Sequence, residues 1–182
     1  MHTEFPVSEL IRDDHREMRR LFGELQNPRL RPLAAPTLLA LLAAHSRAEE
    51  TEVYPKLRHE AGDAVAHSQH EHAEADRLVE RLVKHNLNED EFEHTLKSLV
   101  EAVNHHIEEE ENTVLTEADK LPASEQRVLG SAFTEARSKI LTSIADPLTR
   151  TQLEQQARNE GLQSTRSMTR DDLVGAVTED PS

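Results

Sequence analysis

Two segments of the chain carry a histidine and a glutamate at a spacing that suits metal binding. His45 is followed four residues later by Glu49, and His106 is followed four residues later by Glu110. Residues four apart on a helix point to the same side, so each pair offers two ligands to one cation. Both segments have the form H-x-x-x-E-E-x-x-V, at an offset of 61 residues. This match indicates an internal duplication.

Two further histidines follow a second repeat, at an offset of 57 residues. His15 follows Asp14 and His72 follows Glu71, and both sequences continue with Glu, Arg and Leu at matching places. The chain is therefore predicted to be a duplicated helical hairpin, in which each copy supplies one lone histidine and one H-x-x-x-E motif. All four histidines lie on apolar stripes, which must face the interior of a helical bundle.

Together the two hairpins offer four imidazoles and two carboxylates as candidate metal ligands, namely His15, His45, Glu49, His72, His106 and Glu110. Six nitrogen and oxygen ligands are too many for one tetrahedral zinc ion. They suit two metal ions that accept imidazole and carboxylate, with iron as the first choice, manganese as the second, and the two glutamates as bridges. Two roughly octahedral ions would keep open positions for water, dioxygen or peroxide. The chain has no cysteine, so any metal is held by nitrogen and oxygen alone.

The alternative interpretation is that these histidines are ordinary core residues, as a single histidine on an apolar stripe usually is. Four histidines at duplicated positions favour the metal site, and two buried carboxylates without a cation would cost several kcal/mol each. His105 competes with His106 because Glu109 follows it by four residues, but the repeat favours His106. Asp76 is a further candidate ligand, and Glu52 a candidate outer partner. The remaining histidines are expected in solvent: His2, His59, His67, His70, His85, His94 and His105.

Apolar residues that recur at intervals of three and four predict an all-α protein with five helices. Ser8 is the expected N-cap of the first helix, and a loop with three prolines follows at residues 28–36. Thr37 is the expected N-cap of the second helix, which should end or kink near Pro55. The expected ranges are about 8–26, 37–55, 64–85, 92–114 and 124–144.

Composition excludes several classes of protein. The chain has 182 residues, a formal net charge of −14, no tryptophan and only five glycines, which disfavours sandwiches and barrels. The strong acidity argues against a main body that grips a nucleic-acid backbone, and, Glu110 apart, residues 108–111 are expected to be a solvated acidic face. The first residues lack a secretory pattern, and the longest apolar run, at 38–44, is too short to cross a membrane. We therefore expect a cytoplasmic protein without a membrane partner.

The combined motif resembles the hemerythrin-like HHE cation-binding family. The resemblance covers roughly residues 5–140 and rests on Asp14-His15, His45-x-x-x-Glu49-Glu50, Glu71-His72 and His106-x-x-x-Glu110-Glu111. It implies an antiparallel up-down four-helix bundle, here at 5–145 with an extra fifth helix, around two non-haem iron ions that engage dioxygen or related molecules. Oxygen-carrying members present a second histidine on the third helix, where this chain has Ser68 and Asp76. The final carboxylate is also a Glu four residues after its histidine instead of an Asp five residues after. These departures disfavour reversible oxygen carriage.

The C-terminal segment, at 148–178, is predicted to be a separate two-helix module. Thr169 with Asp172 three residues later forms a capping box, and Gly161 closes the preceding helix. The segment resembles the Rho-termination-factor N-terminal-like (SAP-related) modules, which implies a nucleic-acid partner. A small protein-docking or dimerisation module is the alternative, because the segment carries four arginines against four acidic residues.

Three functions follow from these expectations. In the first, the two metal ions bind dioxygen or nitric oxide for sensing, buffering or storage. The second is a catalase-like enzyme that decomposes peroxide in oxidative-stress defence. In the third, the metal state regulates what the C-terminal module binds. The sequence slightly favours redox chemistry over carriage and does not separate an enzyme from a sensor.

Overall fold

The computed structural model describes residues 5–27, 29–84 and 89–145, and, in the C-terminal part, residues 154, 165, 168, 169, 171–173 and 175. Every regular element in these ranges is helical. The elements are α1 (Val7–Leu25), α2 (Arg31–Ala48), the π-helical segment η1 (Glu49–Val53), α3 (Tyr54–Leu57), α4 (Gly62–Lys84), α5 (Glu89–Asn112), α6 (Val114–Ala118) and α7 (Ala123–Ala145).

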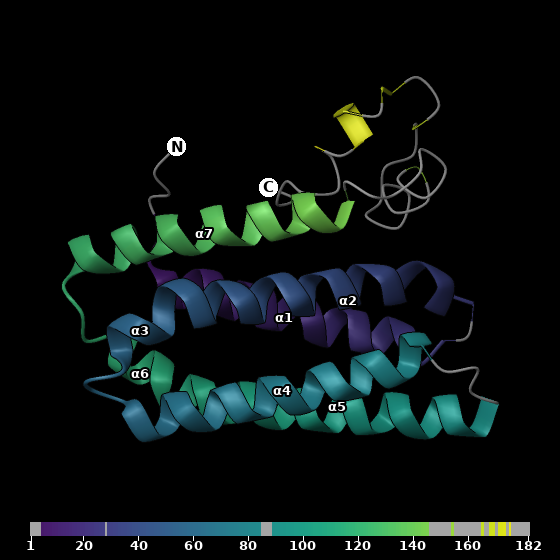
Figure 1. The fold of residues 1–182 in the computed structure, drawn as a ribbon, viewed down its shortest axis with the longest axis horizontal. Helices are drawn as coiled ribbons and strands as arrows, with labels where there is room; N and C mark the ends of the chain where they lie inside the picture. Colours follow the sequence, from purple (N-terminus) through teal and green to yellow (C-terminus); the bar gives the residue numbers. More distant parts are fainter. Residues whose placement is uncertain are drawn as a thin grey trace.

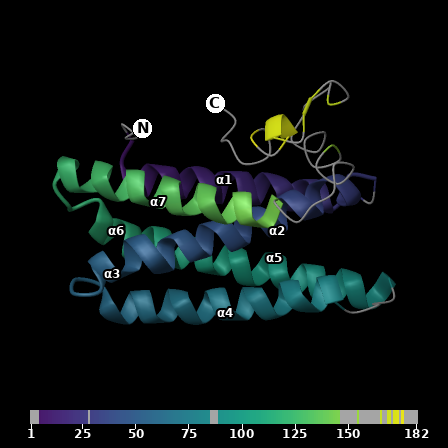
Figure 2. The ribbon, with the colours of Figure 1, turned by 45° about the horizontal axis from the view of Figure 1, so that its top comes forward.

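Four long helices form an antiparallel up-down bundle, as the sequence predicts. Figure 1 shows α1 and α2 as one hairpin above a second hairpin of α4 and α5. The segments η1 and α3 continue the line of α2, and α6 continues α5. The additional helix α7 lies along α2 and α1, on the side away from the second hairpin (Figures 1 and 2). The expected all-α fold with an extra fifth helix is confirmed.

The bundle core consists of two apolar clusters with a polar layer between them. The first cluster lies around α3 and α6 and contains Ile11, Val53, Tyr54, Val114 and Phe133 among others. The second fills the other end and contains Met18, Leu42, Leu99, Val103 and Ile107 among others. The four predicted histidines fall between the two clusters along their helices. Burial of apolar surface on both sides therefore holds this polar layer in place.

The second helix begins earlier than the sequence predicts. We expected a proline-rich loop up to residue 36, but α2 begins at Arg31 and Pro36 lies inside it. Proline is tolerated in the first turns of a helix because the N–H groups there have no intrahelical partner, and Pro32 occupies such a place. The Arg31 guanidinium donates a hydrogen bond to the Leu25 carbonyl at 2.7 Å, which closes the connection from α1.

The predicted cap of the first helix is also wrong. Pro6 is the N-cap of α1, and Ser8 is a buried residue of its first turn. Ser8 lies near Asp119, which follows α6, and helps to lower the pKa of that carboxyl group.

Both H-x-x-x-E segments leave regular α-helical geometry at the glutamate or within three residues after it. On the α2 side the π-helical turn begins at Glu49, whereas the sequence placed the irregularity near Pro55. Pro55 has no N–H to donate to the carbonyl four residues earlier, and this favours a wider turn before it. On the α5 side the break is at Thr113, with φ −120° and ψ −81°.

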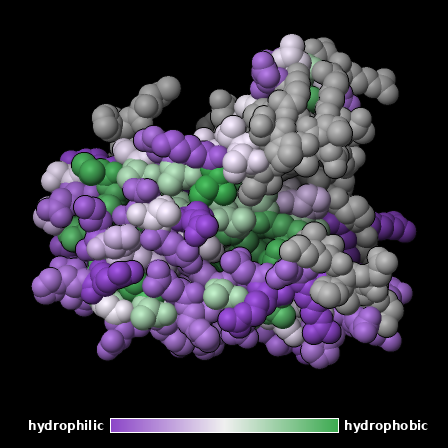
Figure 3. All heavy atoms as spheres, viewed as in Figure 1, coloured by the Kyte–Doolittle hydropathy of each residue, from purple (hydrophilic) through white to green (hydrophobic). Residues whose placement is uncertain are grey.

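Hydrophilic residues cover most of the face in Figure 3, particularly over α4 and α5. No helix of the described residues is long and apolar enough to cross a membrane. The predicted two-helix module lies almost entirely outside the described residues. Its capping box is present, because the Asp172 amide donates to the Thr169 hydroxyl oxygen at 3.1 Å and the Thr169 amide donates to the Asp172 carboxylate at 2.8 Å.

Candidate metal centre

Four of the predicted residues form a first group of potential metal ligands. His15 of α1, His45 of α2, Glu49 of η1 and Glu110 of α5 each offer one atom, and these atoms lie within 4.8 Å of one another. Glu110 Oε2 lies 3.4 Å from His15 Nε2, and Glu49 Oε2 lies 3.3 Å from His45 Nε2. Each carboxylate therefore faces one imidazole of the first hairpin.

A second group shares Glu49 with the first. His72 of α4 and His106 of α5 join Glu49, again with ligand atoms within 4.8 Å of one another. Glu49 Oε2 lies 3.4 Å from His72 Nε2, and Glu110 Oε2 lies 3.8 Å from His106 Nε2. Glu49 and Glu110 thus stand between two pairs of imidazoles, one pair from each hairpin. This is the arrangement expected of two bridging carboxylates.

All six side chains are buried, and none is more than 6% exposed. Burial, together with the negative charge of Glu110, raises the pKa of Glu49 well above its usual range. Burial opposes ionisation of Glu110 as well, but the neighbouring imidazoles of His15, His106 and His45 outweigh it and hold its pKa far below the usual range. Burial and the charge of the neighbouring carboxylate thus act against a second negative charge at this place. A metal ion would supply a positive charge that stabilises both carboxylates.

Several buried atoms of the first group have no hydrogen-bond partner among the described residues, namely His15 Nε2, His45 Nε2, Glu49 Oε1 and Glu110 Oε2. Buried polar atoms normally find a partner, because desolvation otherwise costs about 1–3 kcal/mol each. In the second group, His72 Nε2 and His106 Nε2 face each other at 3.0 Å. These atoms are directed at common points between the side chains, and this fits a pair of metal ions.

Each of the four imidazoles has a carboxylate behind it, at its Nδ1 atom. His15 pairs with Glu111 at 3.0 Å, His45 with Asp14 at 3.2 Å, His72 with Glu50 at 3.3 Å and His106 with Glu71 at 3.0 Å. Such partners fix the tautomer of a ligating histidine, with the proton on Nδ1 and the Nε2 lone pair free for the metal. These four acidic residues were not predicted to contact the imidazoles, although each belongs to the family motif and is adjacent in sequence to a predicted ligand.

Helix α7 also reaches this outer layer. The Arg137 guanidinium donates a hydrogen bond from Nε to Asp14 Oδ2 at 2.9 Å, and both side chains are largely buried. Burial opposes ionisation of Asp14, but the hydrogen bond from His45 and the charge of Arg137 lower its pKa. The carboxylate behind His45 is thereby kept ionised.

Tyr54 is the other participant that the sequence analysis missed. Its hydroxyl donates to Glu110 Oε1 at 2.6 Å and lies 3.3 Å from Glu49 Oε2, while its ring stacks on His72. Burial, and then the charges of the two glutamates, raise the pKa of Tyr54 well above its usual range. Ser68 lies near Tyr54 and acts against this rise in pKa. No repeat points to Tyr54, because its counterpart at the offset of 61 is Leu115.

The comparisons with known proteins agree with this geometry. The hemerythrin HHE cation binding domain matches residues 7–118. The chain belongs to this family. It is also 30% identical, over 139 residues, to a protein of Nostoc sp. (strain PCC 7120) described as a DNA nickase. That match covers 74% of this chain and 40% of the relative, so the chain spans about two fifths of the relative's length. No solved structure matches.

Within the hemerythrin domain, the structure separates the candidates that the sequence left open. His106 points into the second group, whereas the His105 side chain is 62% exposed. Asp76 is exposed and lies in neither group, and Glu52 is half-buried and lies in neither group. His59, His70 and His94 are exposed as expected, and His2 and His85 lie outside the described residues. Glu111 is not simply part of a solvated face, since it pairs with His15.

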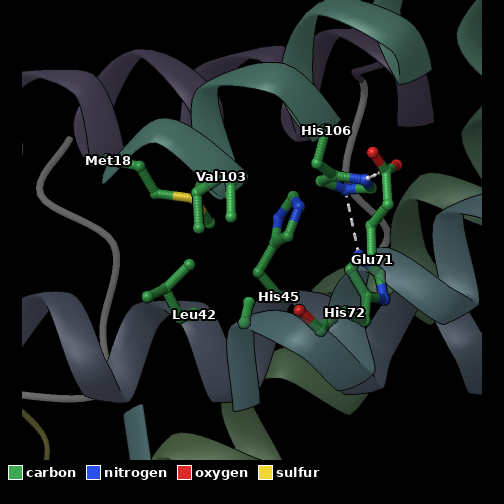
Figure 4. A pocket seen from close by; sticks show the side chains of 10 residues that line it. Met18, Leu42, His45, Glu71, His72, Val103 and His106 are labelled. Carbon is green, nitrogen blue, oxygen red and sulfur yellow. Dashed lines mark hydrogen bonds and ion pairs between the residues drawn. The ribbon is translucent and has the colours of Figure 1, made fainter. Parts of the chain in front are cut away.

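A small pocket of the hemerythrin domain opens beside the second group. Apolar side chains of Met18, Leu42 and Val103 line it on one side, and His45, His72 and His106 on the other. Figure 4 shows these side chains facing one another, with Glu71 behind His106. One wall of the pocket is therefore apolar, and the opposite wall consists of imidazoles of the candidate centre.

Proposed function

We propose that this hemerythrin-domain protein binds two metal ions, iron in preference to manganese, through the six predicted residues. His15 and His45 would hold one ion, His72 and His106 the other, and Glu49 and Glu110 would bridge them. The observation that carries the proposal is the pair of buried ligand groups that share Glu49. The carboxylate behind every imidazole supports it, because that layer is typical of metal-ligating histidines.

We further propose that the centre handles a small molecule, namely dioxygen, nitric oxide or peroxide. Two ferrous ions, when bound, supply electrons and open coordination positions to such molecules. The chain contributes a small pocket, in which the apolar side chains of Met18, Leu42 and Val103 would keep water away from the imidazoles. Tyr54 contributes a hydroxyl group, whose oxygen lies 2.6 Å from Glu110 Oε1 and donates a hydrogen bond to it. Binding for sensing or storage is the function that this arrangement supports best.

Absorption spectroscopy of iron-loaded protein tests this function. Anaerobic diferrous protein should give a stable new spectrum with nitric oxide and return to its starting spectrum when the gas is removed. Protein whose spectrum does not respond to nitric oxide or dioxygen would contradict small-molecule binding. The Leu42→Trp variant should block the response, because the larger ring would fill the pocket, whereas Val128→Trp on the exposed face of α7 should not.

Peroxide decomposition is the second candidate for the same centre. It is favoured by the lack of a second histidine four residues from His72 on α4, where the chain has Ser68 and Asp76, because this departure from the oxygen carriers of the family disfavours reversible carriage. Addition of peroxide to the iron-loaded protein should then evolve oxygen over many turnovers. Oxygen evolution that persists after removal of the iron would exclude this activity.

A role on DNA is a third candidate, since the Nostoc relative is described as a DNA nickase. The C-terminal segment at 148–178, if it forms the expected module, would supply the contact. The main body carries strong negative charge, so this role would depend on that segment. Incubation of supercoiled plasmid with the metal-loaded full chain tests it. Conversion to open circles that disappears when residues 148–182 are deleted would support nicking, and unchanged supercoiled DNA would contradict it.

A further inference from the structure

A second set of metal-ligating side chains lies on the surface of the other hairpin, outside the centre. His67 and Glu71 are four residues apart on α4, and His105 and Glu109 are four residues apart on α5. Each pair repeats the H-x-x-x-E spacing of the inner ligands. Because α4 and α5 pack side by side, the two pairs lie next to each other where these helices meet.

The four side chains converge in the structure. His67 Nε2 lies 2.8 Å from Glu109 Oε2 and 3.6 Å from Glu71 Oε1. His105 Nδ1 lies 2.9 Å from Glu71 Oε1, and its Nε2 lies 3.6 Å from Glu109 Oε1. His67, Glu71 and Glu109 each offer a ligand atom, and these atoms lie within 4.8 Å of one another. Two imidazoles with two carboxylates are a ligand set that suits Zn²⁺.

The internal duplication gives an independent reason for a cation at this place. Glu71 is the repeat counterpart of Asp14, and each carboxylate stands behind one imidazole of the centre. Asp14 is neutralised by Arg137 of α7. In the described part of the chain, Glu71 forms ion pairs with histidines only: His67, His105 and His106.

Residues around Asp14 are apolar where their counterparts around Glu71 are candidate metal ligands. The counterparts of His67, His105 and Glu109 are Leu10, Ala44 and Ala48, which pack in the apolar clusters that include residues of α7. Helix α7 covers these positions of α1 and α2. The equivalent positions of α4 and α5 are not covered in this way, since the side chains of His67 and His105 are 54% and 62% exposed. The α1–α2 hairpin is therefore covered by a helix that supplies an arginine, whereas the α4–α5 hairpin keeps its candidate ligands exposed.

We propose that His67, Glu71, Glu109 and His105 bind a divalent transition-metal ion of the Zn²⁺ type at the protein surface. The ion occupies, toward Glu71, the place that Arg137 occupies toward Asp14. It is separate from the two ions of the centre and does not depend on which metals the centre holds. Glu71 connects the two sites, because its Oε1 faces the surface histidines while its Oε2 accepts a hydrogen bond from His106 Nδ1.

Equilibrium dialysis of iron-loaded, tag-free full-length protein against Zn²⁺, followed by elemental analysis, tests this proposal. Wild type should bind one Zn²⁺ per chain more than the double variant His67→Ala/His105→Ala, whose affinity at this site should fall at least tenfold. The matched control is His70→Ala/His94→Ala, which removes one exposed histidine from each of the same two helices. The control should bind as much Zn²⁺ as wild type.

Equal Zn²⁺ binding by wild type and the His67/His105 variant would overturn the surface site, and so would equal losses in both double variants. The iron content, measured in the same samples, should be the same in all three proteins. Protein without iron but with the Zn²⁺ difference would contradict the proposed function of the centre and leave the surface site standing. The two proposals therefore fail in distinguishable ways.

Discussion

Each imidazole of the candidate centre lies between an inner glutamate and an outer carboxylate. The outer partner lies on another helix in every case. Asp14 and Glu71 serve the neighbouring helix of their own hairpin, while Glu50 and Glu111 serve the opposite hairpin. Because each partner orients one ring and one lone pair, the four outer carboxylates should determine metal affinity almost as strongly as the ligands do.

Replacing one outer carboxylate tests this claim. Glu111→Ala removes the acceptor at His15 Nδ1 and should weaken metal binding by about tenfold to a hundredfold, because the imidazole loses its fixed tautomer. Glu108→Ala, an exposed neighbour on the same helix, is the control and should bind metal as wild type does. Competition with a calibrated chelator measures both affinities. Equal affinities for the two variants would show that the outer layer has no such effect.

The six inner residues could be predicted from the sequence because helical spacing and duplication both mark them. Their outer partners could not be predicted, since each pairing joins residues on different helices and depends on how the hairpins pack. Tyr54 lies beyond prediction for another reason. Its counterpart is Leu115, so the repeat gives no hint, and its hydroxyl reaches the glutamates from the first residue of α3.

Helix α7 is an integral part of the metal-binding bundle rather than an accessory. Phe133 is buried in the first apolar cluster and meets the His45 ring edge-on at a centroid distance of 5.9 Å. Arg137, one turn further on, pairs with Asp14. The helix thus closes the groove between α1 and α2 and neutralises the acidic residue there.

Truncation of Phe133 measures this contribution. Phe133→Ala should lower the free energy of unfolding by about 3–5 kcal/mol, because it removes a buried aromatic ring and leaves a cavity. Val128→Ala, at a position 67% exposed on the same helix, should change stability by less than about 0.5 kcal/mol. Urea unfolding followed by circular dichroism gives both values. A loss for Phe133→Ala no larger than that of the control would mean that α7 does not complete the core.

The connection after α6 is tied to α1 by a bidentate ion pair, and this pair should depend on pH. Arg12 Nη2 donates to Asp119 Oδ2 at 2.7 Å, and the hydrogen bond from Arg12 lowers the pKa of Asp119 below its ordinary value of 3.8. A lowered pKa contributes stability that is present above the unfolded-state pKa and is lost as the pH falls through the folded-state pKa. The pair is partly exposed, so its contribution should be about 0.2–1 kcal/mol.

Unfolding of wild type and Asp119→Asn between pH 7 and pH 3 measures this effect. The difference in stability should be constant near neutrality and shrink below about pH 4. Glu135→Gln, which removes the partner of exposed Lys139, should match wild type throughout. A difference that grows as the pH falls would contradict the assignment.

Element boundaries were predictable where apolar periodicity was strong, as in α1, α4 and α7. The predicted beginning of α2 was wrong, because the three prolines at 28–36 were expected to form a loop. Pro36 lies inside α2, one turn after its beginning, where it gives up the hydrogen bond to the Pro32 carbonyl without ending the helix. The π-helical turn at Glu49 was not predictable, since it depends on accommodating Pro55 and on directing Tyr54 toward the glutamates.

Across the whole molecule, two apolar clusters enclose one layer of ionisable groups. The clusters stabilise the fold, whereas the layer costs free energy as long as its charges lack a cation. Binding of metal to the folded state alone should therefore stabilise the bundle. Most other acidic residues lie on the surface, in keeping with the net charge of −14 and with the hydrophilic face in Figure 3.

Removal of the metal tests this balance. Protein stripped with a chelator should unfold at a lower temperature than metal-loaded protein, and addition of ferrous iron should restore the higher value. Differential scanning calorimetry at matched protein concentration records the change. Identical unfolding temperatures with and without metal would contradict an energetic role for ions in this layer.

The most direct test of the central claim is the metal content of purified protein from iron-replete cells, measured by elemental analysis. Wild type should contain two iron ions per chain. Glu49→Gln should contain at most one, because Glu49 is the ligand that both groups share. Glu52→Gln, three residues away and in neither group, should contain two. Recovery of a single zinc ion or no metal from wild type, or of two ions from Glu49→Gln, would contradict the account.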